Sequence, residues 1–171
     1  MAFVAEDGTG LTDATSLVSV ADADTYFETV SESATWSALT TAAKQAALVA
    51  ATRAVLAHWS TEAWQGYRLS TTQALAFPRG GIVVDGITRD PAPLPPEVIA
   101  AVCHVAIKSA AGTSLLPTRL TASETVSGAV ARTFVSGGSA STIDPVWAYP
   151  ESLLRPLTRA GGGGTIRLMW A

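Results

Sequence analysis

The 171 residues are enough for one compact domain with an appendage; 48% of them are hydrophobic and only 15% are charged. This composition argues against intrinsic disorder and predicts that something other than water covers part of the surface. No uncharged apolar run is long enough for a membrane span, and the first ten residues carry acids where a signal peptide carries bases. We therefore expect a soluble intracellular protein without a membrane partner.

The net charge of −3 is unevenly distributed along the chain. The first 32 residues contain no Lys or Arg and carry −7, whereas the remainder carries +4. An acidic end and a mildly basic remainder favour complementary faces on neighbouring copies, although a solvated helix face with ordinary surface arginines explains each charge equally well. Because the arginines are scattered and form no cluster in the sequence, we expect no basic nucleic-acid footprint.

The first half of the chain predicts two helices after an irregular segment over residues 1–18. Ser19 is a suitable N-cap for an amphipathic helix over 20–31, whose outer face is acidic. Thr40 or Thr41 caps an alanine-rich helix that continues to about Trp59 and is buried on a wide arc. The alanine stripe Ala43, Ala47, Ala50 and Ala54 lies beside a second stripe formed by Leu48, Ala51 and Val55.

The middle of the chain combines turns with the most apolar helix. The Ser70–Gln73 spacing predicts a capping box that opens a single helical turn. Asp85-Gly86 predicts the turn of a small hairpin between 82–84 and Ile87. Pro96 begins a helix that is apolar on all sides, so we expect it at the centre of a bundle, ending at Ala111-Gly112.

After Pro117 the pattern changes from helical to extended. Residues 123–135 alternate and are rich in Val, Thr and Phe, which predicts a β-hairpin or ribbon. Residues 137–141 form a small-residue linker, and Pro150 begins a short helix. We expect the ribbon to contact a neighbouring subunit through Val126, Val130, Arg132 and Phe134.

The last eleven residues combine a glycine run with strand composition. Four glycines predict a flexible hinge unless the segment beyond them is captured. That segment has no partner strand next to it in the sequence, and an isolated strand of this length is unstable, so we expect it to join a sheet edge on another chain. The hinge comprises Gly161, Gly162, Gly163 and Gly164, and the partner-binding strand comprises Thr165, Ile166, Arg167, Leu168, Met169 and Trp170.

The predicted fold is mainly α: a small helical bundle with a β-hairpin ribbon arm and an extended C-terminal strand. The N-terminal segment and the bundle occupy residues 1–117. The ribbon and the short helix occupy 118–160, and the glycine-tethered tail occupies 161–171.

The candidate reactive residues have simpler structural explanations. Cys103 and His104 are adjacent, and neighbours on a helix point about 100° apart, so a shared metal is disfavoured. With two histidines on separate helices and no nucleophile motif, the sequence predicts no enzyme, no cofactor and no metal site. Trp36, Trp59 and Trp64 are expected in the core, whereas Trp147 and Trp170 are expected to contact a partner.

Four segments resemble head-tail connector (adaptor) proteins of tailed phages, part of a group also labelled DnaT-like single-stranded-DNA-binding protein. The resemblance covers nearly the whole chain, and the shared motifs are packing motifs that contain no arrangement of catalytic residues. The segments are residues 1–11, Tyr26-Phe27, Thr72–Arg79, and Tyr149-Pro150 with Leu154–Leu157.

The resemblance implies a non-enzymatic virion protein in the neck between capsid and tail, made in the host cytoplasm. Roughly twelve copies would form a ring on the portal protein, meet stopper or tail proteins below, and let DNA pass through without sequence-specific binding. Two alternatives remain: a single-stranded-DNA-binding module, and a stopper or tail-completion protein lower in the neck.

Overall fold

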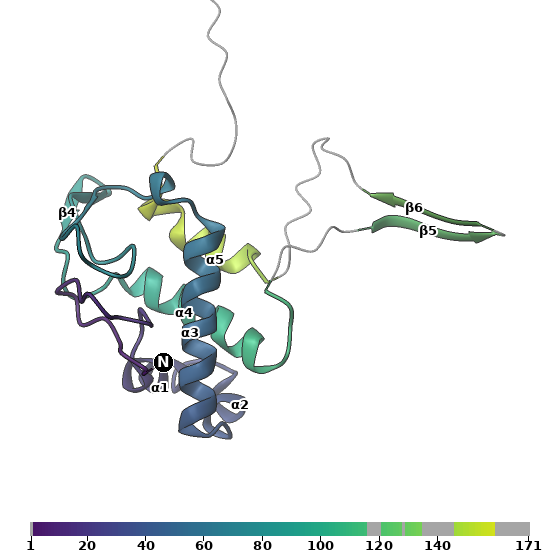
Figure 1. The fold of residues 1–171 in the computed structure, drawn as a ribbon, viewed down its shortest axis with the longest axis horizontal. Coiled ribbons are helices and arrows are strands. Elements are labelled where there is room, and N and C mark those ends of the chain that lie inside the picture. Colours follow the sequence, from purple (N-terminus) through teal and green to yellow (C-terminus); the bar gives the residue numbers. More distant parts are fainter. Residues whose placement is uncertain (1, 116–120, 128, 135–145, 160–171) are drawn as a thin grey trace, which may run out of the picture.

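The computed structural model describes residues 2–115, 121–127, 129–134 and 146–159 (Figure 1). This part of the chain is a mixed α/β protein, so the predicted mainly α fold is confirmed only in part. Three two-stranded antiparallel sheets accompany five α-helices. The elements are α1 (Val20–Phe27), α2 (Ser33–Ser37), α3 (Thr41–His58), η1 (Thr61–Ala63), β1 (Tyr67–Arg68), β2 (Arg79–Gly80), β3 (Ile82–Val84), β4 (Ile87–Arg89), α4 (Pro96–Ala110), β5 (Thr121–Ser127), β6 (Ala129–Phe134), α5 (Ala148–Leu154) and η2 (Arg155–Leu157).

Helix α4 lies at the centre of the bundle, as its all-round apolar sequence predicts. It packs against α3, α5 and α1 (Figure 1). Pro96 occupies the first turn, and Gly112 ends the helix at φ +77°, where the Thr113 N–H reaches the Lys108 carbonyl at 3.0 Å. No helix in the described ranges is long and apolar enough to cross a membrane. The residues buried along α4 are Val98, Ala101, Val102, Cys103, Val105, Ala106 and Ile107.

Helix α3 begins at the predicted cap, where the Thr40 hydroxyl accepts the Ala43 N–H. Its buried face contains the whole second stripe, Leu48, Ala51 and Val55, together with Thr52 and only Ala47 of the alanine stripe. Ala43, Ala50 and Ala54 are only partly buried. The observed buried face is narrower than the predicted one because α4 packs on one side of α3 and leaves the alanine-rich side closer to solvent.

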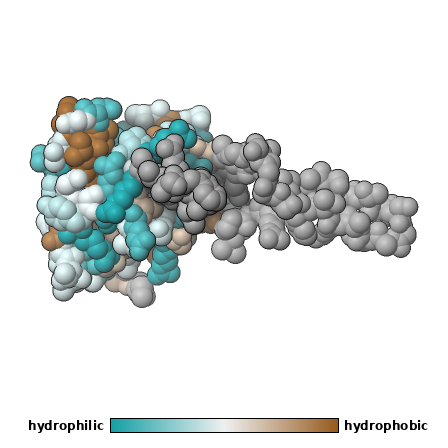
Figure 2. Space-filling model, turned by 90° about the horizontal axis from the view of Figure 1, so that it is seen from above, coloured by the Kyte–Doolittle hydropathy of each residue, from teal (hydrophilic) through white to brown (hydrophobic). Residues whose placement is uncertain are grey.

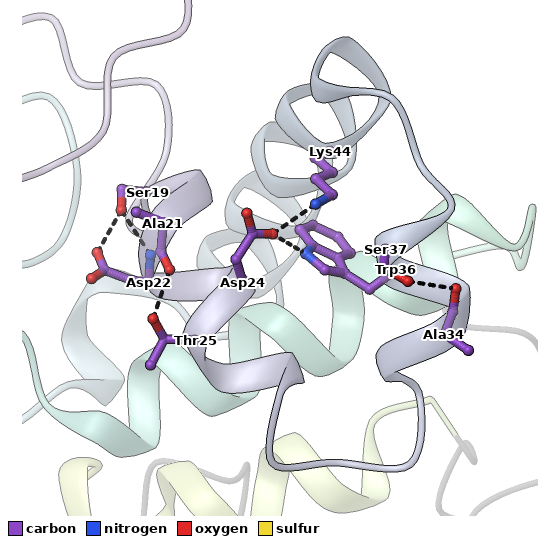
Figure 3. Close-up of polar contacts among 9 residues, drawn as sticks. All are labelled: Ser19, Ala21, Asp22, Asp24, Thr25, Ala34, Trp36, Ser37 and Lys44. Carbon is purple, nitrogen blue, oxygen red and sulfur yellow. Dashed lines mark hydrogen bonds and ion pairs between the residues drawn. The ribbon is translucent and has the colours of Figure 1, made fainter.

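Helix α1 ends at Phe27, four residues before the predicted end, and a separate short helix α2 follows. The predicted N-cap is confirmed, because the Ser19 hydroxyl accepts the Asp22 N–H at 3.1 Å (Figure 3). Trp36 of α2 stacks on Phe27 with ring centroids 4.5 Å apart, and its indole N–H donates to Asp24 at 2.6 Å. Burial of this indole ring explains why the chain turns back instead of continuing the helix.

The predicted hairpin around Asp85-Gly86 is confirmed as β3–β4. Both turn residues have positive φ, 54° and 79°, which suits a two-residue turn. The predicted helical turn after Ser70 is wrong, because residues 70–78 form no helix. The Gln73 side chain does accept the Ser70 N–H, but its amide nitrogen is used on the carbonyls of Leu75 and Pro78, which holds a loop.

Helix α5 begins at Ala148, two residues before the predicted start, and places Pro150 in its first turn. The expectation that Trp147 contacts a partner is wrong, because its ring lies in the core. Trp147 stacks on His58 at 4.2 Å between ring centroids and meets Trp59 at 6.0 Å. Trp36 and Trp64 are buried and Trp59 is partly buried against the core, as predicted.

Candidate functional site

The β5–β6 ribbon confirms the hairpin predicted over residues 123–135. Its register pairs Val126 with Val130 and Glu124 with Arg132, and a bulge separates Thr121 from Ser123. In Figure 1 the ribbon stands away from the helices, and the sheet has only these two strands. Both outer edges therefore lack a strand partner within the described ranges, which is the geometry that favours pairing with another chain. The contact of Val126, Val130, Arg132 and Phe134 with a neighbour stays a prediction.

The predicted hinge and partner-binding strand lie outside the described residues. The hinge glycines are 161–164, and the strand residues are 165–170. Their role in binding another subunit stays a prediction.

The fold brings three arginines together, Arg68, Arg79 and Arg159, which we call the arginine cluster. The Arg79 side chain is buried, and its Nε donates to the Gln65 carbonyl at 2.7 Å while its Nη2 donates to the Gly66 carbonyl at 3.0 Å. The pKa of Arg79 is lowered, first by burial and then by the positive charges of Arg68 and Arg159. Within the described part, none of the three is ion-paired with a carboxylate.

An exposed aromatic ring lies next to this cluster. Tyr67 retains 65% of its accessible surface although it belongs to β1. Its ring packs over Gly80 and Gly81, where an added Cβ would lie 3.0 Å from the ring, so a side chain at either position would have to displace the ring; Gly81 also has a φ of +71°, which favours glycine. Tyr67 and Arg68 are thus neighbouring exposed positions of β1, although one Arg68 N–H donates to the Leu75 carbonyl at 2.9 Å. An aromatic ring can stack on a base, and a guanidinium group without a carboxylate partner can contact a phosphate.

The arginine cluster corrects the expectation that the arginines form no group. Arg68 lies in β1, Arg79 in β2, and Arg159 two residues after η2. The pairing of β1 with β2 joins the first two, and the Arg159 N–H bonds the Ala63 carbonyl just before β1. Because these contacts connect distant parts of the chain, no local spacing in the sequence could reveal the cluster.

The acidic N-terminal stretch is only partly a charged face. Glu6 is buried, and its carboxylate accepts the backbone N–H groups of Gly8, Gly10 and Leu11 at 2.8–3.1 Å. Asp24 forms an ion pair with Lys44 at 2.8 Å. The acids of this stretch therefore hold the fold together as well as facing solvent.

The side chains of Cys103 and His58 fit structural roles. Cys103 is fully buried, which raises its pKa to about 12 and keeps the thiol protonated. His58 contacts Glu151 at 3.1 Å while stacking on Trp147, so it links α3 to α5. No three His, Cys, Asp or Glu side chains gather as a metal site in the described residues.

His104 borders a polar surface pocket that the sequence did not indicate. Tyr26, Glu32 and Tyr149 line the same pocket. Burial lowers the pKa of His104, and burial followed by the neighbouring Tyr149 raises the pKa of Tyr26 to about 12. At neutral pH His104 and Tyr26 are therefore uncharged, whereas the hydrogen bond from Ser31 lowers the pKa of Glu32 and keeps that carboxylate charged, so the pocket combines neutral polar groups with one negative charge.

The described residues define a small mixed α/β protein with a projecting β-ribbon and an exposed arginine–tyrosine surface. Residues 1–170 match the family model described as "Putative DnaT-like ssDNA binding protein", and the chain belongs to this family. No curated protein and no solved structure matches the chain.

Proposed function

We propose that this protein is a structural assembly protein, a head-to-tail adaptor that forms a ring on the portal of a tailed phage. The ring would extend the DNA channel toward stopper or tail proteins in the virion neck. The protein would be made in the host cytoplasm and would perform no catalysis.

The ribbon is the observation that carries this proposal. A two-stranded sheet that stands away from its own helices is marginally stable alone, and a partner would supply the missing packing. A cyclic ring of identical copies needs two different complementary surfaces on each subunit. The ribbon is one such surface, and the resemblance of the chain to connector proteins supports this use of it.

The test replaces residues 116–145 by a short Gly-Ser linker and measures docking on purified portal rings by native mass measurement and electron microscopy. We expect the variant to stay folded and to lose ring assembly. A chain ending at Gly161 tests the predicted partner-binding strand in the same assay.

The matched control is Glu28→Gln, an exposed acid at the end of α1 that forms no ion pair within the described residues. It should assemble like the parent chain. Unchanged docking of the ribbonless variant would overturn the proposal. Capture by tail-tube protein rather than by portal would instead assign the stopper or tail-completion role lower in the neck.

The arginine cluster favours a second candidate function, binding of single-stranded DNA. Arg68 and Arg159 present exposed guanidinium groups for phosphates, and Tyr67 presents an exposed ring for a base. The description of the family names the same activity.

A labelled oligonucleotide titrated at several salt concentrations tests this function. The double variant Arg68→Ala/Arg159→Ala should weaken binding. It should also reduce the steepness of the plot of log binding constant against log salt concentration by about two, roughly one per lost phosphate contact. Lys108→Ala, which removes a positive charge at the end of α4, is the matched control. Absence of salt-dependent binding in the parent chain would exclude this function.

A further inference from the structure

We propose that the outer edge of β4 is the docking site for residues 165–170 of the same chain, which add to the β3–β4 hairpin as a third strand. This inference does not depend on the adaptor role. It concerns the free protomer, before any partner is bound.

The β4 edge has unused hydrogen-bonding groups. The register pairs Val84 with Ile87 across the two-residue turn and Val83 with Thr88 next to it. In an antiparallel hairpin with a two-residue turn, the two residues that flank the turn bond each other through their backbone N–H and C=O groups. The backbone N–H and C=O groups of the next pair point away from the partner strand, toward the outer edges of the hairpin. On β3 the outward Val83 N–H donates to the Gln65 side chain. On β4 the corresponding groups of Thr88 have no partner among the described residues.

Apolar side chains are exposed on this hairpin. Ile87 on β4 retains 68% of its accessible surface and Val83 on β3 retains 44%. Figure 2 shows hydrophobic side chains gathered at the left end of the molecule, the end where Figure 1 places β4. An added strand next to β4 would cover Ile87 and complete a three-stranded sheet, which is more stable than an isolated hairpin.

The segment beyond the glycines has the matching chemistry. Ile166, Leu168 and Trp170 alternate with Thr165, Arg167 and Met169, so a strand over 165–170 has one strongly apolar face. Asp85 and Asp90 flank β4 and form no ion pair within the described part of the chain. Arg167 supplies the opposite charge.

The described chain ends within reach of the hairpin. One side chain, that of Gln65, bonds the carbonyl of Thr158 at 3.2 Å and the N–H of Val83 at 3.3 Å. Residues 160–164 can span about 16 Å when extended, and adjacent strands lie about 4.8 Å apart, so the linker can carry the segment past β3 to β4. The short linker also gives a high effective concentration, which favours the same chain over a second copy.

Hydrogen exchange at the Thr88 amide tests the proposal. We expect exchange at least about tenfold slower in the full chain than in a chain ending at Gly164, because the added strand occupies this N–H. The protection should be the same at low and high protein concentration. Equal exchange in the two chains would overturn the proposal. Protection that disappears on dilution would assign the strand to another copy and overturn the same-chain assignment.

Two further variants separate docking from folding. Thr88→Pro removes the outward N–H but no bond within the hairpin, and it should make the 161–170 segment sensitive to protease while the melting temperature of the body stays unchanged. Ile166→Ser/Leu168→Ser should give the same sensitivity, whereas the control Met169→Ser on the opposite strand face should not. Equal sensitivity of all three variants and the parent chain would contradict the strand geometry. None of these measurements involves portal protein or DNA. A negative result would therefore overturn the docking of residues 165–170 without affecting the proposed function, which has separate tests.

Discussion

Asp24 shows how one surface-facing acid can connect three helices, because it lies in α1 and contacts one residue each of α2 and α3. Its carboxylate receives the Trp36 indole N–H at 2.6 Å and the Lys44 ammonium at 2.8 Å, and Lys44 also lies 5.4 Å from the centre of the Trp36 ring (Figure 3). The pKa of Asp24 is lowered, chiefly by the hydrogen bond from Lys44. The charged form is therefore the one that the folded state stabilises.

Asp24→Asn should reduce the free energy of unfolding at pH 7 by about 0.5–1.5 kcal/mol, a modest value because the carboxylate is 44% exposed. Because the folded-state pKa of Asp24 lies below its ordinary value of 3.8, the stabilisation is complete above that pH and disappears as the pH falls through the folded-state pKa. Urea titrations of the parent and the variant at several pH values measure this difference. Glu28→Gln should show no comparable loss, and a difference between Asp24→Asn and parent that persists in strong acid would contradict the ion-pair explanation.

Thr52 is a buried polar residue with a defined role. Its hydroxyl accepts the Leu17 N–H at 3.1 Å, which fastens the N-terminal segment to α3. Thr52→Val keeps the shape and leaves that N–H unpaired, so we expect a loss of about 1–3 kcal/mol in denaturant unfolding. Thr52→Ser keeps the hydroxyl, and its cost should be limited to the missing methyl group. Equal stability of Thr52→Val and the parent would show that water replaces the bond.

Among the elements, the β1–β2 pairing holds the arginine–tyrosine surface in place, and Gly66 permits it. Gly66 has φ +68°, and a Cβ there would overlap the Gly80 carbonyl oxygen. Gly66→Ala should therefore cost about 2–4 kcal/mol and displace Tyr67. Gly86 has a similar φ of +79° but nothing near its Cβ position, so Gly86→Ala isolates the backbone strain at about 1 kcal/mol. Thermal unfolding distinguishes them, and equal losses would show that the overlap relaxes without cost.

The sequence predicts the elements whose signals are local. The N-caps Ser19 and Thr40, the first-turn Pro96 and the Asp85-Gly86 turn each act within a few residues, and the structure confirms them. The early end of α1 escapes prediction because it depends on Trp36 stacking on Phe27. Burial of Trp147 depends on α3, which is distant in sequence. The arginine cluster also escapes prediction, because it is assembled by contacts between residues distant in sequence: the β1–β2 pairing and the contact of Arg159 with Ala63.

At the scale of the whole molecule, the ribbon is an insertion between two helices that already pack together. Helix α4 precedes the ribbon and α5 follows it, and these helices contact each other in the body. Trp147, at the start of α5, is anchored by His58 and Trp59 of the α3 region. The body therefore contains its own core without the strands of the ribbon.

Replacing residues 116–145 by a short Gly-Ser linker should leave the melting temperature of the body within a few degrees of the parent, because shortening a loop changes the closure entropy by only about 0.6 kcal/mol per halving. Calorimetry measures this directly. Trp147→Ala is the comparison at the other extreme, since emptying a buried indole site costs about 3–5 kcal/mol and should lower the melting temperature strongly. If the ribbonless chain melts as early as Trp147→Ala, the ribbon is part of the fold of its own protomer and is not free to serve a neighbouring subunit.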